Sequence, residues 1–280
     1  MDRSREILLY ATSECSRKCN HCYLGYNGSW EPDELFRCAE HLQRDYVVII
    51  NGAEVLSNVE YLRSFKLIGQ QFIFTNGVYL ASNRFDYYMN ALLDNDVKSV
   101  RISHHFDSID CLNAVKATVV ERAINRLLSF GFEVRINTTI TSESFDKIAR
   151  ICESAVRLGV KHIRFFCLQN IGSAKGMNRN LFLSDDMKLE MYGEVLRCRS
   201  AYGIEDLYIG LAGNFSKIVP HFTCSYGTNM LSITPDKKIY GCPFAVGNLP
   251  PIGILTDHFD VKIDSSLAPS SSSSCLIEQW

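Results

Sequence analysis

The segment ATSECSRKCNHCYLG, residues 11–25, carries three cysteines in a C-x3-C-x2-C spacing. Cys15, Cys19 and Cys22 therefore place three thiolates in one short loop. Four cysteines would close a [4Fe–4S] cluster as an electron carrier, whereas three leave one iron open to a substrate or cofactor, as catalytic metal sites do. A structural zinc site is the alternative reading, but zinc takes a fourth protein ligand, and His21 is too close to Cys22 to serve easily. The spacing favours chemistry at this loop.

The chain around this loop alternates short apolar runs with amphipathic segments. That alternation is typical of repeated βα units, which build a parallel sheet. Ser-Asp-Asp at residues 184–186 is a good start for a sixth helix, since it offers an N-cap and acids at the positive helix end. We expect an α/β fold, a partial (β/α)6 barrel with three quarters of a closed TIM-type repeat. Its strands are expected at residues 7–12, 46–51, 71–75, 99–104, 133–140 and 162–168, and its helices at 32–44, 58–69, 82–94, 113–131, 144–159 and 184–202.

Further motifs follow the cysteine loop in chain order. They are Asn51-Gly52-Ala53-Glu54, Thr75-Asn76-Gly77 and Ser103, each near the end of an expected strand. With the cysteine loop after the first strand, this ordered set resembles the radical S-adenosylmethionine (SAM) superfamily over about residues 5–180. The resemblance implies a [4Fe–4S] cluster whose open iron is chelated by SAM. It also implies that an electron from the cluster cleaves SAM, and that the 5′-deoxyadenosyl radical removes hydrogen from an unactivated substrate carbon.

Polar residues stand where a parallel barrel binds its ligands, at the C-terminal strand ends. By resemblance, Glu54 meets the amino group of SAM, while Ser103 and polar residues of the fifth strand such as Asn137 meet its ribose or carboxylate. Asn76 completes the expected cofactor-binding set. Taken alone, Asn76 and Ser103 would be an ordinary turn residue and a strand-end cap.

Cys167, near the end of the sixth expected strand, is the candidate catalytic residue. If its thiol faces the cavity, it is placed to return a hydrogen atom to a substrate radical; if it faces the helices, it belongs to the core. His104 and His105 are candidates for proton transfer, although a His pair in a loop more often serves structure. Cysteines predicted to be small buried hydrophobes are Cys38, Cys111, Cys152 and Cys198.

The chain beyond residue 203 contains a predicted hairpin bracketed by Cys224 and Cys242, formed by MLSIT, a turn at PDKK, and IYGC. With the Cys-Pro and Gly-Asn that follow, it resembles a SPASM or Twitch domain. That resemblance implies an auxiliary iron–sulfur cluster on Cys224, Cys242 and Cys275. The hairpin taken alone is also compatible with a structural zinc clip or with free cysteines. Cys275 follows a polyserine run, which is typical of flexible chain. The expected domains are a barrel over 1–202 and this extension over 203–280.

Composition agrees with an enzyme of this kind. At 280 residues, 46% of them hydrophobic, the chain can bury a large core. A net charge of -2 offers no argument for binding nucleic acid or acidic membranes. Because no apolar run approaches a membrane span and the N-terminus lacks a signal-peptide pattern, we expect a cytoplasmic protein.

The reaction expected from the resemblance is oxidation (dehydrogenation) or epimerisation of a small molecule, served by a one-electron reductant such as flavodoxin or ferredoxin. An auxiliary cluster would accept an electron from the substrate, whereas a thiol would return a hydrogen atom. A peptide maturase is the first alternative, but the cluster loop begins at Cys15, which leaves no space before it for a leader-binding domain. A non-enzymatic iron–sulfur or zinc-binding protein is the second alternative.

Overall fold

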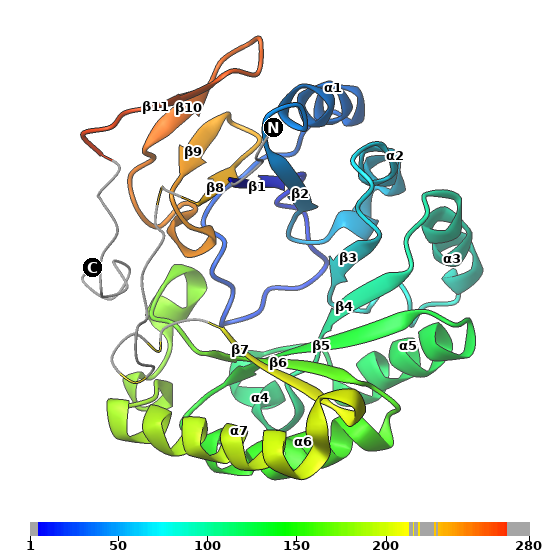
Figure 1. Ribbon diagram of the computed structural model, residues 1–280, viewed down its shortest axis with the longest axis vertical. Helices are drawn as coiled ribbons and strands as arrows, with labels where there is room; N and C mark the ends of the chain where they lie inside the picture. The colour runs from blue at the N-terminus through cyan, green and yellow to red at the C-terminus, as the bar shows by residue number, and fades with distance from the viewer. Residues whose placement is uncertain (1–4, 213–214, 216–217, 219–226, 228, 268–280) are drawn as a thin grey trace.

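The strands of the protein curve in an arc, and the helices cover the outer side of that arc (Figure 1). A computed structural model describes residues 5–212, 215, 218, 227 and 229–267. Cys224 and Cys275, two of the three predicted auxiliary ligands, lie outside the described residues. The α/β class and the partial parallel barrel are confirmed.

All six predicted strands are present, and β3, β4, β5, β6 and β7 form a parallel five-stranded sheet in that order. β1 and β2 pair in parallel in a second sheet. Apolar runs such as VVII and HIRFF form strands because alternate side chains are buried along them. The bounds are β1 Glu6–Tyr10, β2 Val47–Asn51, β3 Phe72–Thr75, β4 Ser99–Ser103, β5 Glu133–Ile140, β6 His162–Cys167 and β7 Tyr208–Ala212.

The helices also follow the predicted pattern. Ser184 caps α7 as expected, because its side chain accepts a hydrogen bond from the Met187 N–H at 3.2 Å. The segment predicted as one helix over 58–69 is instead a 3-10 turn followed by a short helix, and α4 was not predicted. Within the described part of the chain, no helix combines the length and apolar character needed to cross a bilayer. The bounds are α1 Pro32–Leu42, α2 Leu62–Leu67, α3 Phe85–Asp94, α4 Ile109–Leu112, α5 Ala117–Ser129, α6 Ile148–Arg157 and α7 Asp185–Asp206.

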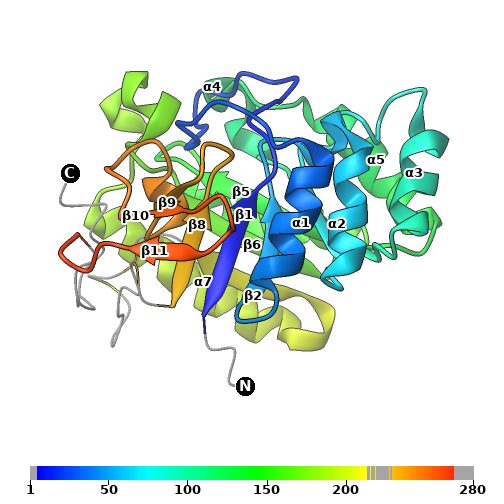
Figure 2. The same cartoon turned by 90° about the horizontal axis from the view of Figure 1, so that it is seen from above.

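The C-terminal strands extend the sheet that contains β1. The predicted hairpin is present as β8 and β9, which pair in antiparallel fashion, and β8 also pairs in parallel with β1. Figure 2 shows β8 beside β1, and the sheet continues from β8 through β9 to the short strands β10 and β11. The predicted division at residue 202 stays a prediction, although β7 continues the sheet of β6 beyond it. The bounds are β8 Met230–Ile233, β9 Lys238–Tyr240, β10 Gly253–Leu255 and β11 Val261–Ile263.

Strand register separates an outer, helix-covered face from an inner face. Ile102, Ile136 and Ile163 are register partners on β4, β5 and β6 and share one face. This is the outer face, because a Cβ added at Gly77 would meet both the Ile102 side chain and Ala123 of α5. Residues one step out of phase along these strands therefore point inward.

The alternation predicts a difference in stability between two neighbouring phenylalanines on β6. Phe165 is 0% exposed on the outer face, whereas Phe166 is only partly buried on the inner face. We expect Phe165→Ala to lower the free energy of unfolding by about 3–5 kcal/mol, because it leaves a cavity under the helices. Phe166→Ala is the matched control and should cost clearly less in urea denaturation. Equal losses would contradict the assignment of the two faces.

Candidate functional site

The three motif cysteines lie in the loop that leaves β1, at the edge where the parallel strands end. Cys15 is exposed and Cys19 and Cys22 are half-buried. The Cys15 sulfur accepts hydrogen bonds from the Arg17 backbone N–H and the Asn76 side-chain amide, each at 3.4 Å. The Asn20 N–H donates to the Leu112 carbonyl at 2.9 Å, which joins the loop to α4. Two chain segments far from the loop in sequence therefore help to place it.

The chemistry of these thiols fits a cluster. Burial raises the pKa of all three, to about 11 at Cys19, where the nearby charges of Cys15 and Cys22 add to the effect. Metal binding would therefore displace protons from neighbouring sulfurs. Among the residues that the structure describes, no three His, Cys, Asp or Glu side chains converge on one metal ion. Three cysteines in one loop suit a [4Fe–4S] cluster with an open iron, whereas zinc takes a fourth protein ligand.

A side-chain clamp from the C-terminal part of the chain holds this loop. The Asn248 amide donates to the Tyr23 carbonyl at 2.7 Å, and its oxygen accepts the Gly172 N–H at 2.7 Å. The Ser173 N–H donates to the Cys22 carbonyl at 2.9 Å. One carboxamide thus ties the cluster loop to the segment after β6. The sequence offered Asn248 only as part of a Gly-Asn resemblance, and its clamping role was missed.

The residue before the clamp has to be glycine. Gly247 has a φ of +68°, in the left-handed region, and a Cβ there would lie 2.0 Å from the carbonyl oxygen of Gly25. The two backbones touch because the Gly25 N–H also donates to the Val246 carbonyl at 3.2 Å. A larger residue at Gly247 would push the loop away.

Glu54 is fully buried and is bonded within the protein. It accepts hydrogen bonds from the Thr75 hydroxyl and the Asn76 N–H, each at 2.9 Å, and from the Leu56 N–H at 3.3 Å. Burial raises the pKa of the Glu54 carboxyl to about 7, against the opposing effect of these bonds. All three donors are neutral, so a cation bound nearby would stabilise the ionised form of the Glu54 carboxyl. The contact with the SAM amino group stays a prediction, while the bond to Asn76 fixes the residue that reaches Cys15.

The other predicted cofactor-binding residues lie side by side. Ser103 and Asn137 are register partners on β4 and β5, and both point inward and are half-buried. Asn76 follows β3, the neighbour of β4. The structure thus brings Asn76, Ser103 and Asn137 to one edge beside Cys15, and their roles toward SAM stay predictions.

Cys167 shares the outer face with Ile163 and Phe165, and it is 2% exposed. The sequence left open whether the Cys167 thiol faces the cavity or the helices, and in the structure it faces the helices. Cys111 differs from expectation in the opposite sense, because it is half-buried and lines a cavity of about 670 Å³ together with Cys19 and Cys22. Its place on the unpredicted helix α4 explains why the sequence pattern did not reveal this. Cys38, Cys152 and Cys198 are buried as predicted, and Cys242 is half-buried.

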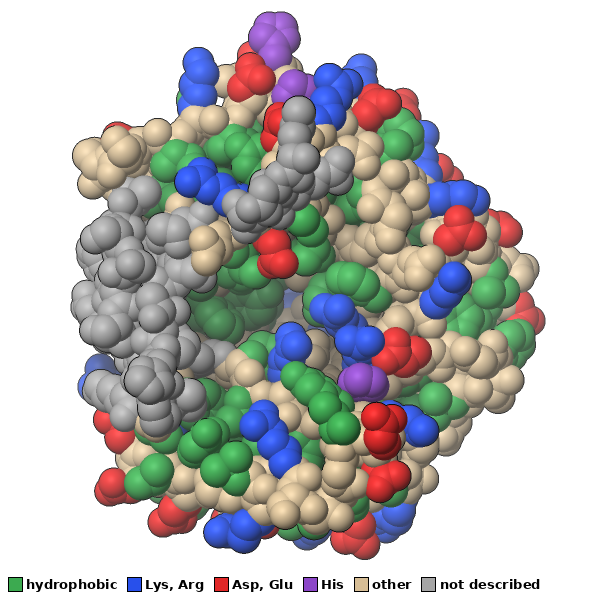
Figure 3. Space-filling model, in the orientation of Figure 1, with side chains coloured by type: hydrophobic (Ala, Val, Ile, Leu, Met, Phe, Trp, Pro, Cys, Tyr) green, Lys and Arg blue, Asp and Glu red, His purple; other side chains and the backbone are tan. Residues whose placement is uncertain are grey.

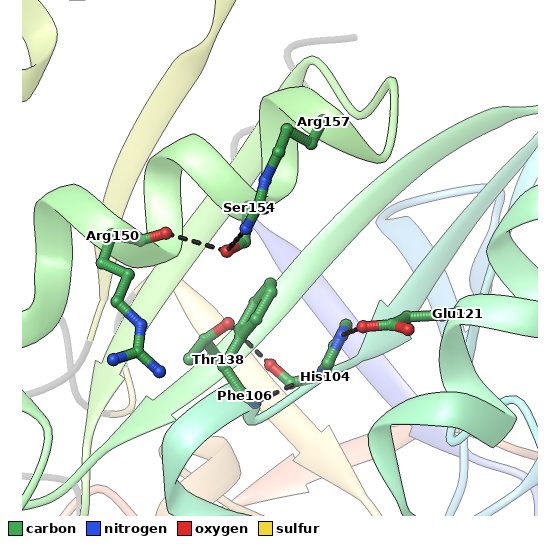
Figure 4. Close-up of polar contacts among 7 residues, drawn as sticks. All are labelled: His104, Phe106, Glu121, Thr138, Arg150, Ser154 and Arg157. Carbon is green, nitrogen blue, oxygen red and sulfur yellow. Dashed lines mark hydrogen bonds and ion pairs between the residues drawn. The ribbon is translucent and has the colours of Figure 1, made fainter.

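The two histidines after β4 are buried in different places. His104 points to the outer layer, where its Nε2 lies 3.6 Å from the Glu121 carboxylate and its ring stacks on Phe106 (Figure 4). Burial lowers the pKa of His104 to about 4 and also lowers that of His105. The His105 ring packs against His21 of the cluster loop, with centroids 4.5 Å apart. Both rings are thus neutral near pH 7, which favours the structural role over proton transfer.

Comparison with known proteins gives relatives in sequence and in fold. No family model matches the sequence. The chain is 25% identical to the GTP 3',8-cyclase of Staphylococcus epidermidis over 293 residues, which cover 92% of this chain and 81% of the cyclase. Among solved structures, Streptococcus suis SuiB bound to S-adenosylmethionine has a TM-score of 0.71 at 14% identity, over 88% of this chain. This chain spans only 62% of SuiB.

Two further structures agree. The structure of anSMEcpe with bound AdoMet has a TM-score of 0.68 at 14% identity, over 94% of this chain and 82% of anSMEcpe. HemN from Escherichia coli, a radical SAM enzyme, has a TM-score of 0.54 at 10% identity, over 70% of this chain and 52% of HemN. The chain therefore has the fold of radical SAM enzymes, and the resemblance inferred from its motifs is confirmed at that level. A SPASM or Twitch extension stays a prediction.

The clamp predicts that Asn248 supports both folding and cluster retention. Asn248→Ala should lower the free energy of unfolding by about 1–3 kcal/mol, because it leaves the Gly172 N–H and the Tyr23 carbonyl without their partner. It should also lower the iron retained after anaerobic reconstitution. Asn58→Ala, which removes an asparagine bond at the surface, is the matched control. Iron retention equal to that of the control would refute the clamp.

The buried carboxyl predicts a pH dependence that can be isolated. Between pH of about 4.5, the ordinary pKa of Glu, and about 7, the folded protein keeps the Glu54 proton while the unfolded chain loses it. Stability from this group is therefore lost as pH rises through that window, by on the order of 3 kcal/mol. Urea denaturation of wild type and Glu54→Gln from pH 5 to pH 8 should show a difference in stability that shrinks or reverses with rising pH. A difference that does not change with pH would mean that Glu54 is ionised throughout.

Proposed function

We propose that this protein is a radical SAM enzyme that reductively cleaves S-adenosylmethionine and abstracts hydrogen from an unactivated carbon of its substrate. The observation that carries the proposal is the grouping of Cys15, Cys19 and Cys22 with Asn76 at the strand edge of a barrel with the radical SAM fold. Similar structures contain bound SAM by their own description. The non-enzymatic alternative leaves the ordered set of Glu54, Asn76 and Ser103 after the cysteine loop as a coincidence.

A [4Fe–4S] cluster bound by the three cysteines would supply the electron and the open iron for SAM. The protein's own groups then have distinct tasks. The Arg17 N–H and the Asn76 amide donate to the Cys15 sulfur and so stabilise its thiolate form. Glu54 accepts a hydrogen bond from the Asn76 N–H and so fixes the position of Asn76. Ser103 and Asn137 offer a hydroxyl and an amide to the polar end of the cofactor. The clamped loop keeps these groups in one arrangement, as catalysis by positioning requires.

The net reaction that we propose remains oxidation or epimerisation of a small molecule, with flavodoxin or ferredoxin as reductant. If a thiol returns hydrogen, Cys111 is the better placed candidate, because it lines the cavity with Cys19 and Cys22, whereas Cys167 faces the helices. Peptide modification is the second candidate. It is favoured by the likeness to SuiB, which was solved bound to the precursor peptide SuiA, and to anSMEcpe, which was solved with the Cp18Cys peptide.

Cleavage of SAM tests the proposal before any substrate is known. Anaerobically reconstituted protein, given dithionite and SAM, should release 5′-deoxyadenosine and methionine, measured by mass spectrometry. Cys15→Ala should reduce this release at least 100-fold, because it removes one of the three thiolate ligands. Cys152→Ala, which changes a buried cysteine on α6, is the matched control and should retain the activity. Absence of 5′-deoxyadenosine from iron-loaded wild type would overturn the proposal.

A further inference from the structure

Three arginines line the inner face of three adjacent strands. Arg101 on β4 is the register partner of Arg135 on β5, and Arg164 on β6 is the partner of Asn137. All three occupy positions out of phase with the outer-face isoleucines, so their side chains start from the inside of the barrel. They influence one another, because burial and then the charges of Arg135 and Arg164 lower the pKa of Arg101 to about 10.

The positive charge of this arginine cluster, Arg101, Arg135 and Arg164, is only partly compensated. Glu133 accepts from Arg135 at 2.9 and 3.2 Å, and the same carboxylate lies 3.2 Å from His162. Within the described residues, neither Arg101 nor Arg164 has an ion pair or hydrogen bond from its guanidinium. Arg101 is half-buried and Arg164 is exposed, so the cost of an absent counter-ion falls mainly on Arg101, and an anion bound there would be stabilised.

Arg101 is held in a fixed position without using its hydrogen-bond donors. Its guanidinium lies over the rings of Phe72 and Phe74, at 3.6 and 5.1 Å from their centroids. Its buried Nε has no hydrogen-bond partner. Aromatic stacking orients the plane of the guanidinium and leaves its edge free to bind, which suits the two oxygens of a carboxylate or phosphate.

The arginine cluster lies close to the candidate cofactor site. Arg101 precedes Ser103 by two residues on the same face, a separation of about 7 Å along a strand. Gly210 on β7 leaves room beside Arg164, because a Cβ there would lie 3.3 Å from the Arg164 Nε. Figure 3 shows a hollow in the middle of the molecule with Lys and Arg side chains on its border. A small molecule inside the barrel would therefore reach both places.

We propose that Arg101, Arg135 and Arg164 bind the anionic end of the substrate, and that this substrate is a small molecule carrying phosphate or carboxylate groups. That the bound anion is a substrate rests on the proposed function, whereas the existence of an anion-binding site does not. The site narrows the small molecule of the proposed function to an acidic compound. We expect more than one negative charge on the substrate. The Glu133 carboxylate pairs with Arg135 and leaves Arg101 and Arg164 without a counter-ion among the described residues.

Binding of simple anions tests the site without knowledge of the substrate. Inorganic tripolyphosphate and citrate are titrated into the reconstituted protein by calorimetry, with and without SAM, and a short acidic peptide forms a third arm. We expect binding of one equivalent of at least one small anion, weakened by added salt. Arg101→Gln and Arg164→Gln should each raise the Kd about tenfold or more, since each removes a charged donor. Arg197→Gln, on the outer surface of α7, is the control and should leave Kd unchanged.

The arms separate the possible outcomes. Tighter binding of tripolyphosphate assigns a phosphate substrate, and tighter binding of citrate assigns a carboxylate substrate; both support the site. Arg101→Lys, which keeps the charge, should recover part of the affinity if Arg101→Gln folds poorly. No binding of either small anion, binding of the peptide alone, or binding insensitive to every cluster variant would overturn the inference. Release of 5′-deoxyadenosine without substrate, measured on the same samples, reports separately on the proposed function.

Discussion

The side chain of Asn248 is the interaction on which the rest of the site depends. Backbone carbonyls and N–H groups in an irregular loop need hydrogen-bond partners. Here the Asn248 carboxamide supplies one to the cluster loop at Tyr23 and one to the segment after β6 at Gly172. Since Gly247 touches Gly25 directly, the loop has no freedom to drift from this support. The cysteines are thereby positioned by packing that lies outside their own motif, as precise metal and cofactor sites require.

Much of this arrangement could be read from the sequence, and the parts that could not have a common physical cause. Six strands and the Ser184 cap were predictable because they rest on local periodicity and local hydrogen bonding. The parallel pairing of β8 with β1, the clamp at Asn248 and the cavity position of Cys111 were not, because each depends on contacts between distant segments. The orientation of Cys167 became decidable only once strand register was known, since alternation alone leaves both faces open.

Buried polar side chains in this protein are of two kinds, and the two kinds have different roles. Burial favours the uncharged form of Glu54, His104 and His105, and these side chains stabilise the geometry of neighbouring loops. Arg101 is half-buried and keeps its charge, and its buried Nε has no hydrogen-bond partner within the described residues. The first kind belongs to the architecture of the site, and the second kind is what distinguishes the interior of this barrel as a place for a ligand.

The pairing of β8 with β1 has a consequence for how the protein is made. Glu6 begins to pair with Met230, so the first strand gains its second neighbour only after most of the chain has been synthesised. Contacts of such long sequence separation form late in folding. During translation the cysteine loop is therefore held on one side only, and the clamp closes over it near the end. The loop therefore reaches its final, clamped arrangement only when the last strands are in place.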